Sequence, residues 1–401
     1  MRSELVVIGA GPAGACAAAV AARAGRDVLL VDRGTRPGTH LPESWHGGCA
    51  KLLAAIGVAD PFAACRDRTR VRLGDRTGVL LEIELRARRG GTGVRLDRVS
   101  FDEMLLANAL AQGARHLPGH GVRSVDLAGR PSLVVHGADG EITVTADYLV
   151  DAGGKSALVG TAAGLVTESP VALDPRVIVF SHHRPAGADP LTEQGSMTVL
   201  RVRGGYLFVI PVAADRVSVG AVVAARRAGG ADPAAVLAEA IAEVPEVAAL
   251  VGAATRLLPP IVGRNHTYRC TRFAGENFAI AGDAAAFADP FFCTGIDFAV
   301  RTGIEAGRAA AHTLAGQDPV AVADRYGAAV DAALTDLTAG ALPRLTSGAS
   351  AALLAAVVDP HLPSVLPLAA LLTHAGGGAV TEPRAAGLVA AGRSAFADIP
   401  A

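Results

Sequence analysis

Lysine is scarce in this chain of 401 residues: Lys51 and Lys155 are the two that occur, so nearly all positive charge comes from arginine. Tryptophan occurs once, as Trp45, and aromatic residues make up 4% of the chain. The formal net charge is −1, so the basic excess typical of nucleic-acid-binding proteins is missing. We therefore expect no nucleic-acid partner.

The five cysteines contain no Cys-x-x-Cys pair. Zinc sites and redox dithiols commonly place two cysteines at that spacing, so the sequence predicts no metal site. No disulfide framework is indicated either, and a reducing cytoplasm is the expected location.

Long uninterrupted apolar runs are also missing. The first apolar run, residues 4–11, follows no basic region and is typical of a strand, not of a signal peptide. A membrane span needs about 20 uninterrupted apolar residues. The most apolar later stretch, residues 350–372, is broken by Asp359, Pro360, His361, Pro363 and Pro367. We expect two buried helical pieces there, with shallow membrane contact as the minor alternative.

Apolar residues are abundant overall. Hydrophobic residues make up 51% of the chain and charged residues 19%, which indicates large buried cores and argues against disorder. The length fits two or three domains.

The N-terminal segment has the pattern of a strand, a helix and a second strand. Residues 4–8 are a β-rich apolar run, residues 12–24 are strong helix formers that stop at Gly25, and residues 27–32 are a second apolar run. Such a βαβ unit implies a parallel sheet and an α/β fold.

A glycine-rich run, Gly-Ala-Gly-Pro-Ala-Gly, begins at Gly9 between this strand and helix. Gly9 permits the tight turn, Gly11 lets the backbone approach a pyrophosphate, and Gly14 lets the helix pack on the strand. Pro12 and Ala13 begin the helix, whose N-terminal N–H groups can bind phosphate. The run predicts a dinucleotide site.

Asp32 ends the second strand, where a carboxylate can bind ribose hydroxyls, and Arg33 follows it directly. These residues alone leave both NAD and FAD open. Strand-rich sequence between residues 165 and 262 interrupts the pattern, so the nucleotide fold is expected to be discontinuous.

Three later segments resemble the flavoprotein monooxygenases of the p-hydroxybenzoate hydroxylase type. They are residues 95–114 (Arg-x-x-Phe-Asp-x-x-Leu), 150–160 and 278–299 (Gly-Asp-Ala…Asp-Pro…Gly). The resemblance implies FAD as the cofactor and a Rossmann-like, three-layer ββα domain. The FAD contacts that it implies are Arg98, Val122, Gly282, Asp283, Pro290, Thr294, Gly295 and Ile296. For Asp283, an N-cap role is the structural alternative.

The strand and helix patterns, together with this resemblance, predict three parts, although the resemblance leaves the C-terminal tail unmatched. An FAD-binding domain comprises residues 1–70, 95–160 and 265–320, and the inserted residues 165–262 form a mostly antiparallel substrate-binding sheet. Residues 321–401 form a helical C-terminal region.

Within the superfamily, residues 41–45, 205–211 and 289–296 resemble segments of the flavin-dependent halogenases. The first resembles an entry segment, with Pro42 in place of glycine, and implies that Ser44 contacts the flavin. The second keeps the spacing of Gly-Trp-x-Trp-x-Ile-Pro, with Tyr206 and Phe208 in place of both tryptophans. The third resembles a turn whose backbone holds chloride beside the flavin.

The lysine with which halogenases capture hypohalous acid is missing from its expected region. Residues 64–78 contain arginine and no lysine, and Lys51 comes too early. An arginine stays protonated and cannot form the chloramine-type adduct of an amine. Cys293 replaces the turn serine, and Phe292 stands where tryptophan halogenases have a glutamate. From this pattern we expect a halogenase-like protein that does not halogenate.

Three residues are candidates for catalysis. His46 is either an acid/base beside the flavin or a polar residue at a loop–helix junction. Glu43 either hydrogen-bonds the flavin or caps the helix that begins near Gly47. Cys293 either packs under the flavin as a small residue, acts as a redox or nucleophilic thiol, or carries the flavin covalently.

The expected substrate site lies between the flavin and the inserted sheet. Trp45 is either a core residue or a substrate platform there. The candidate lining residues are Trp45, Tyr206, Phe208, Phe291 and Phe292. His182 and His183 are neighbours on a predicted strand, so they should point to opposite faces of the sheet.

These observations lead to one main hypothesis and three alternatives. The main hypothesis is an FAD-dependent monooxygenase that hydroxylates an aromatic or electron-rich substrate, a small molecule or a peptide- or carrier-bound group, through a flavin hydroperoxide. The alternatives are an oxidase or dehydrogenase that takes hydride from its substrate, a halogenase with an unrecognised lysine, and a flavin-binding protein without turnover. No second glycine fingerprint follows a strand, so electrons come from a separate flavin reductase, transient NAD(P)H or the substrate.

Overall fold

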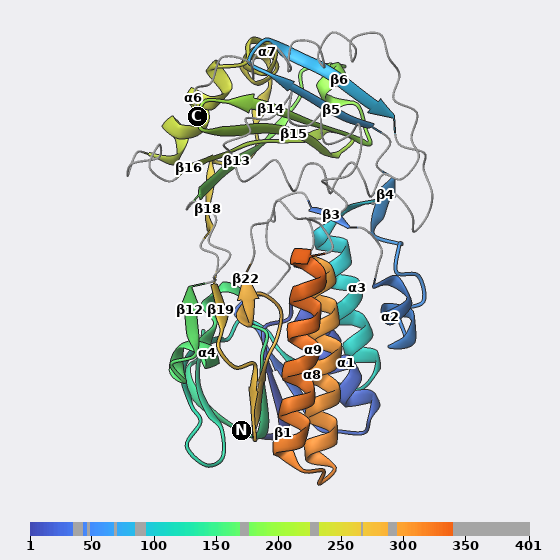
Figure 1. Cartoon of the computed structure of the whole chain (residues 1–401), viewed down its shortest axis with the longest axis vertical. Helices are drawn as coiled ribbons and strands as arrows, with labels where there is room; N and C mark the ends of the chain where they lie inside the picture. Colours follow the sequence, from blue (N-terminus) through green and yellow to red (C-terminus); the bar gives the residue numbers. More distant parts are fainter. Residues whose placement is uncertain are drawn as a thin grey trace, which may run out of the picture.

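The computed structural model describes residues 1–34, 43–45, 49–67, 70–84, 94–168, 176–224, 232–265, 268–287 and 295–339. They form two lobes along the long axis of the molecule (Figure 1). The lower lobe contains the N-terminus, a parallel sheet and four helices, α1, α3, α8 and α9. The upper lobe contains a broad sheet covered by α6 and α7.

The sheet of the lower lobe confirms the predicted βαβ unit. Strands β1 (Arg2–Ile8) and β2 (Val28–Val31) pair in parallel, and α1 (Pro12–Arg23) connects them. The strand order is β20-β21-β11-β1-β2-β8. The other strands are β8 (Arg115–Leu117), β11 (Gly140–Asp151), β20 (Ala274–Gly275) and β21 (Phe278–Ile280).

Strand β11 belongs to two layers at once. Its first half pairs antiparallel with β10 (Ser132–Gly137), which pairs with β9 (Gly121–Asp126), as the predicted meander requires. Its second half pairs in parallel with β1 and β21. The lower lobe therefore has the three-layer ββα arrangement expected from the sequence.

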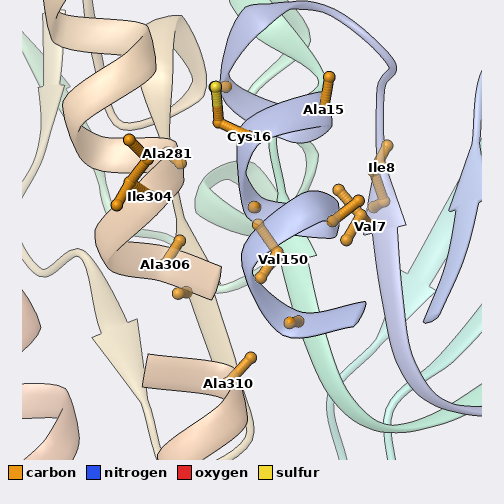
Figure 2. Packing of buried hydrophobic residues seen from close by; sticks show 14 of the residues in the cluster. Val7, Ile8, Ala15, Cys16, Val150, Ala281, Ile304, Ala306 and Ala310 are labelled. Atoms are coloured by element: carbon orange, nitrogen blue, oxygen red, sulfur yellow. The ribbon is translucent and has the colours of Figure 1, made fainter. Parts of the chain in front are cut away.

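Helices α1, α3 (Arg98–Ala111), α8 (Gly295–Leu314) and α9 (Pro319–Ala339) pack side by side against the parallel sheet (Figure 1). Figure 2 shows the alanine-rich contact, with Ala306 and Ala310 of α8 beside α1. Glycines allow this close approach, because a Cβ added to Gly303 would lie 2.2 Å from the carbonyl oxygen of Ala13. The small residues of α8 thus hold α1, and the glycine-rich turn before it, in place.

The sheet of the upper lobe has the strand order β17-β13-β16-β15-β14-β5-β6 and is antiparallel except for the pair β14–β5. Strand β18 also pairs with β13. The strands are β5 (Arg70–Asp75), β6 (Gly78–Glu84), β13 (Arg176–Arg184), β14 (Ser196–Val202), β15 (Gly205–Ala213), β16 (Arg216–Ala224), β17 (Thr255–Arg256) and β18 (Ile261–Asn265). Strands β5 and β6 come from a segment that the sequence analysis left mostly outside both domains.

The two faces of this sheet have different partners. One face buries Val179, Leu207 and Val219 against α6 (Pro233–Ala242) and α7 (Pro245–Ala253). The opposite face carries a separate apolar cluster, and it faces the lower lobe because α6 and α7 cover the other side (Figure 1).

Short elements complete the described structure. Two three-stranded sheets are formed by β3 (Glu43–Trp45), β7 (Val94–Leu96) and β4 (Cys65–Asp67), and by β12 (Val166–Glu168), β19 (Tyr268–Cys270) and β22 (Ala286–Phe287). The short helices are α2 (Ala50–Ala55), α4 (Leu158–Ala162), η1 (Gly154–Ser156), η2 (Pro190–Thr192) and η3 (Gly282–Ala284). Among the described helices, none combines the length and apolarity needed to cross a bilayer.

Candidate active site

The glycine-rich turn lies between β1 and α1, and two of its glycines are required by the fold itself. Gly9 has a φ of +91°, and a Cβ added to it would lie 2.5 Å from the carbonyl oxygen of Ala152. A Cβ added to Gly14 would lie 1.8 Å from the carbonyl oxygen of Gly9. The turn is therefore wedged tightly against the end of β11.

Gly11 differs from its neighbours because nothing lies within 4 Å of a Cβ added to it. Gly11 is the N-cap residue of α1, and no side chain caps this helix end. Pro12 and Ala13 form the first turn, so the N-terminus of α1 is available to an anion. The free N–H groups at this helix end and the open space next to Gly11 together fit the pyrophosphate of FAD.

Asp32 fixes the conformation of the glycine-rich turn. Its Oδ2 accepts a hydrogen bond from the backbone N–H of Ala10 at 2.6 Å, and its Oδ1 accepts one from Gly34 at 2.5 Å. Arg33 follows in an exposed position, and Val122 is partly buried in β9. Asp32 thus stabilises the turn through the backbone of Ala10 and Gly34, and the ribose contact predicted for it stays a prediction.

Arg98 begins α3 and forms a two-point ion pair with Asp102, one turn further along. Its Nη2 lies 3.0 Å from Oδ2 of Asp102, and both side chains are largely buried. The sequence suggested Arg98 as a flavin or phosphate contact but did not identify its carboxylate partner.

The second FAD motif lies directly against the first. A Cβ added to Gly282 would lie 3.0 Å from Cβ of Ala13, and the N–H of Gly282 donates to Oγ1 of Thr302 at 2.9 Å. Asp283 follows within η3, whose N-cap is Ala281, so Asp283 does not cap that helix. Two segments far apart in sequence therefore meet at the N-terminus of α1.

Gly295 and Ile296 form the first turn of α8. The next residue, Asp297, is 8% exposed, and its Oδ1 accepts a hydrogen bond from the backbone N–H of Cys49 at 3.0 Å. This contact ties the chain that follows β3 to the start of α8. The sequence analysis missed Asp297, although an acidic residue in a first helical turn could have suggested it.

Several predicted site residues lie outside the part of the chain that the structure describes. They are His46, Pro290, Phe291, Phe292, Cys293 and Thr294. Glu43, Ser44 and Trp45 form β3, whose backbone pairs with Leu96, Arg95 and Val94 of β7. The proposed roles of these nine residues remain predictions.

Tyr206 and Phe208 both lie on the face of the upper sheet that faces the lower lobe. Phe208 and Phe180 flank Gly220, where an added Cβ would lie 2.3 Å from the tip of the Phe208 ring. Because Gly220 has no side chain, the Phe208 ring can pack directly over its backbone. The cluster comprises Ile178, Phe180, Phe208, Ile210 and Val222, with Met197, Tyr206 and Ile261 partly buried beside it.

The region where the halogenase lysine was expected includes β5, and an arginine of this strand is tightly held. Arg72 is 4% exposed, and its Nε and Nη2 lie 2.5 Å and 2.6 Å from Glu82 and Glu193. Burial alone would lower the pKa of Arg72, but hydrogen bonds to these carboxylates raise it. Arg72 therefore acts as a fixed structural cation.

His182 and His183 are buried on opposite faces of β13. Burial, followed by the nearby charges of Arg216 and His183, lowers the pKa of His182 to about 4. Burial and then the charge of Arg256 lower the pKa of His183. Both imidazoles are thus neutral at pH 7.

This pair predicts acid sensitivity of the fold. In the unfolded chain both imidazoles are protonated near pH 6.5, whereas in the folded protein their pKa values are lower, so protonation favours unfolding. The free energy of unfolding should fall as pH falls from about 6.5 towards 4, and urea denaturation across this range measures it. In His182→Phe the fall should be shallower than in the parent chain, and equal slopes would contradict the assignment.

Comparison with known proteins identifies relatives over most of the chain. Residues 2–341 match the family described as "FAD binding domain". The chain is 27% identical over 352 residues to the flavin-dependent halogenase armH3 of Armillaria mellea, covering 79% of this chain and 68% of that protein. It is 25% identical to the 1H-pyrrole-2-carbonyl-[peptidyl-carrier protein] brominase of Pseudoalteromonas luteoviolacea, covering 79% of each.

A solved structure supports the fold. The crystal structure of CmlS, a flavin-dependent halogenase, superimposes with a TM-score of 0.73 at 22% identity, covering 99% of this chain and 71% of that one.

Proposed function

Because this chain belongs to the FAD-binding family of the flavoprotein monooxygenase superfamily and uses FAD, we propose that this flavin-dependent oxidoreductase halogenates an electron-rich aromatic substrate. The observation that carries the proposal is the similarity to a flavin-dependent halogenase over 79% of the chain. The FAD-binding segments predicted above make up about half of the chain, so the similarity extends beyond them. The relatives favour this alternative over hydroxylation, the main hypothesis from the sequence.

When bound and reduced, FAD would supply the two electrons with which O2 and halide give hypohalous acid and water. The residues of this chain position and shield that chemistry. The N-terminus of α1 and the open backbone at Gly11 hold the pyrophosphate. The apolar face around Phe208 accommodates the aromatic substrate and excludes water from it.

The amine required by this chemistry has two candidates. Lys155 lies in η1, with Nζ 3.8 Å from the centre of the Phe287 ring. Phe287 ends β22, directly before residues 289–296, the segment that resembles the halide-binding turn. Lys51 lies on α2, and both lysines are exposed. By position, Lys155 is the stronger candidate.

The proposal predicts a halogenated product. The protein is incubated with FAD, a separate NADH-dependent flavin reductase, O2, bromide and a panel of free phenols and carrier-bound pyrroles. Mass spectrometry should show a brominated product, and Lys155→Ala should reduce its rate at least about 100-fold, roughly 2.7 kcal/mol of barrier. Lys51→Ala, in α2 and far in sequence from the segment that resembles the halide-binding turn, should keep most of the activity.

Hydroxylation remains the second candidate, because arginines occupy the region of the missing lysine. The same reaction under ¹⁸O2 distinguishes the two. Incorporation of ¹⁸O into the product, with no bromine isotope pattern, would replace the first proposal by the second.

A further inference from the structure

Two polar side chains lie side by side on the apolar face of the upper sheet. His182 of β13 is paired in register with Ser218 of β16, and Ser218 is paired with Ile210 of β15. The adjacent row of the same face contains Phe180, Gly220 and Phe208. The rings of His182 and Phe180 are 5.8 Å apart. The polar pair therefore borders the aromatic cluster.

Within the part of the chain that the structure describes, neither side chain has a hydrogen-bond partner. His182 is 5% exposed and Ser218 is fully buried, yet both ring nitrogens of His182 and the hydroxyl of Ser218 are unpaired. Each buried polar group without a partner costs about 1–3 kcal/mol. Both ring nitrogens of His183, on the other face, are unpaired as well. The three atoms of His182 and Ser218 differ because they lie together beside the aromatic cluster, where a ligand can supply the missing partner.

The electrostatics of the pair favour a neutral partner. The His182 imidazole is neutral, so it offers one donor and one acceptor, and the serine hydroxyl offers the same. The described members of the surrounding cluster are apolar, and Arg216, the nearby cation that acts on His182, is exposed at the start of β16. A carboxylate would lose its hydration here without a buried counter-charge. A hydroxyl can both donate and accept, which matches the pair.

We propose that His182 and Ser218 bind the hydroxyl group of a phenolic substrate whose ring packs on Phe180 and Phe208. The phenol donates to the unprotonated nitrogen of His182 and accepts from the hydroxyl of Ser218. The inference rests on the proposed function for the aromatic nature of the substrate, and it makes His182 and Ser218 determinants of specificity.

Binding to the FAD-loaded protein tests this inference without turnover. The probes are 2-naphthol and naphthalene, which share their rings and differ by the hydroxyl, and titration calorimetry gives the dissociation constants. His182→Phe and Ser218→Ala should each weaken binding of 2-naphthol at least about tenfold and leave naphthalene unchanged. In the parent protein, 2-naphthol should also shift the ¹⁵N resonances of the His182 ring.

His183→Phe is the matched control, because His183 is the next residue, is 4% exposed and points to the opposite face. This variant should bind 2-naphthol like the parent. The inference would be overturned if the His182 and His183 variants weakened 2-naphthol binding equally, or if a variant lost affinity for both probes equally. It would also be overturned if neither His182→Phe nor Ser218→Ala changed the affinity for 2-naphthol. An aliphatic alcohol, cyclohexanol, that binds as tightly as 2-naphthol would refute the phenolic class. Selective binding without any brominated product would refute the proposed function alone.

Discussion

Gly11→Ala is expected to fold like the parent chain and to bind FAD at least about 100-fold more weakly, roughly 2.7 kcal/mol. Gly11 has a φ of −69°, which alanine adopts freely, and nothing lies within 4 Å of the added methyl group. The folded chain therefore accommodates the methyl group. The pyrophosphate does not, because this group would occupy the space through which it approaches the N-terminus of α1.

Two measurements separate binding from folding in this variant. Urea denaturation of the FAD-free protein should give an unchanged or slightly higher free energy of unfolding, since alanine restricts the unfolded chain. Fluorescence titration with FAD should give the weaker dissociation constant. Gly14→Ala is the contrasting variant, because its methyl group would lie 1.8 Å from the carbonyl oxygen of Gly9 and should disrupt the fold itself. FAD affinity that is unchanged in a folded Gly11→Ala variant would show that the phosphates bind elsewhere.

Gly303→Ala is expected to destabilise the lower lobe by about 3 kcal/mol or more. The added Cβ would lie 2.2 Å from the oxygen and 2.8 Å from the carbon of the Ala13 carbonyl group, both backbone atoms that cannot rotate away. Helices α1 and α8 must separate to admit it. Because Ala13 lies in the first turn of α1, FAD binding should weaken together with stability.

Gly327→Ala in α9 provides the control for helix propensity. Gly327 also lies inside a long helix, but nothing lies within 4 Å of its added Cβ. Alanine should therefore stabilise this helix by up to about 1 kcal/mol. Thermal unfolding of both variants measures the difference. If Gly303→Ala were as stable as the parent, the close contact between α1 and α8 would not determine the packing of the lobe.

The sequence predicted the local architecture of the cofactor lobe well, because the signals there are local. The apolar run of β1, the glycine turn and the alanine-rich α1 follow one another within 23 residues, and each has a strong pattern. The opposite faces of His182 and His183 followed from the two-residue period of a strand. The fold class, FAD and the resemblance to flavoprotein monooxygenases are confirmed.

Features that depend on distant pairing could not be predicted. Strand β5 joins the upper sheet by pairing in parallel with β14, more than a hundred residues later, and a short strand contains no signal for such a partner. The ion pair of Arg72 with Glu193 depends on the same pairing, whereas Arg72 and Glu82 face each other in the neighbouring strands β5 and β6. The contact between Asp297 and Cys49 joins two segments that are even further apart, at a separation of 248 residues.

The relatives favour a different reaction from the one that the sequence analysis preferred. The missing lysine in residues 64–78 was given more weight than the overall resemblance, and hydroxylation was preferred. Our proposal places the amine on another segment of the fold, at Lys155 beside Phe287.

A single-turnover reaction tests the central proposal most directly. The protein is loaded with one equivalent of FAD and reduced by light in the absence of any reductase, with EDTA as the electron donor. It is then mixed with O2, bromide and 2-naphthol. The mass spectrum of the product should show bromonaphthol, with the equal isotope doublet of bromine, in an amount approaching that of the FAD. Hydrogen peroxide with unchanged 2-naphthol, or a hydroxylated naphthol, would contradict halogenation.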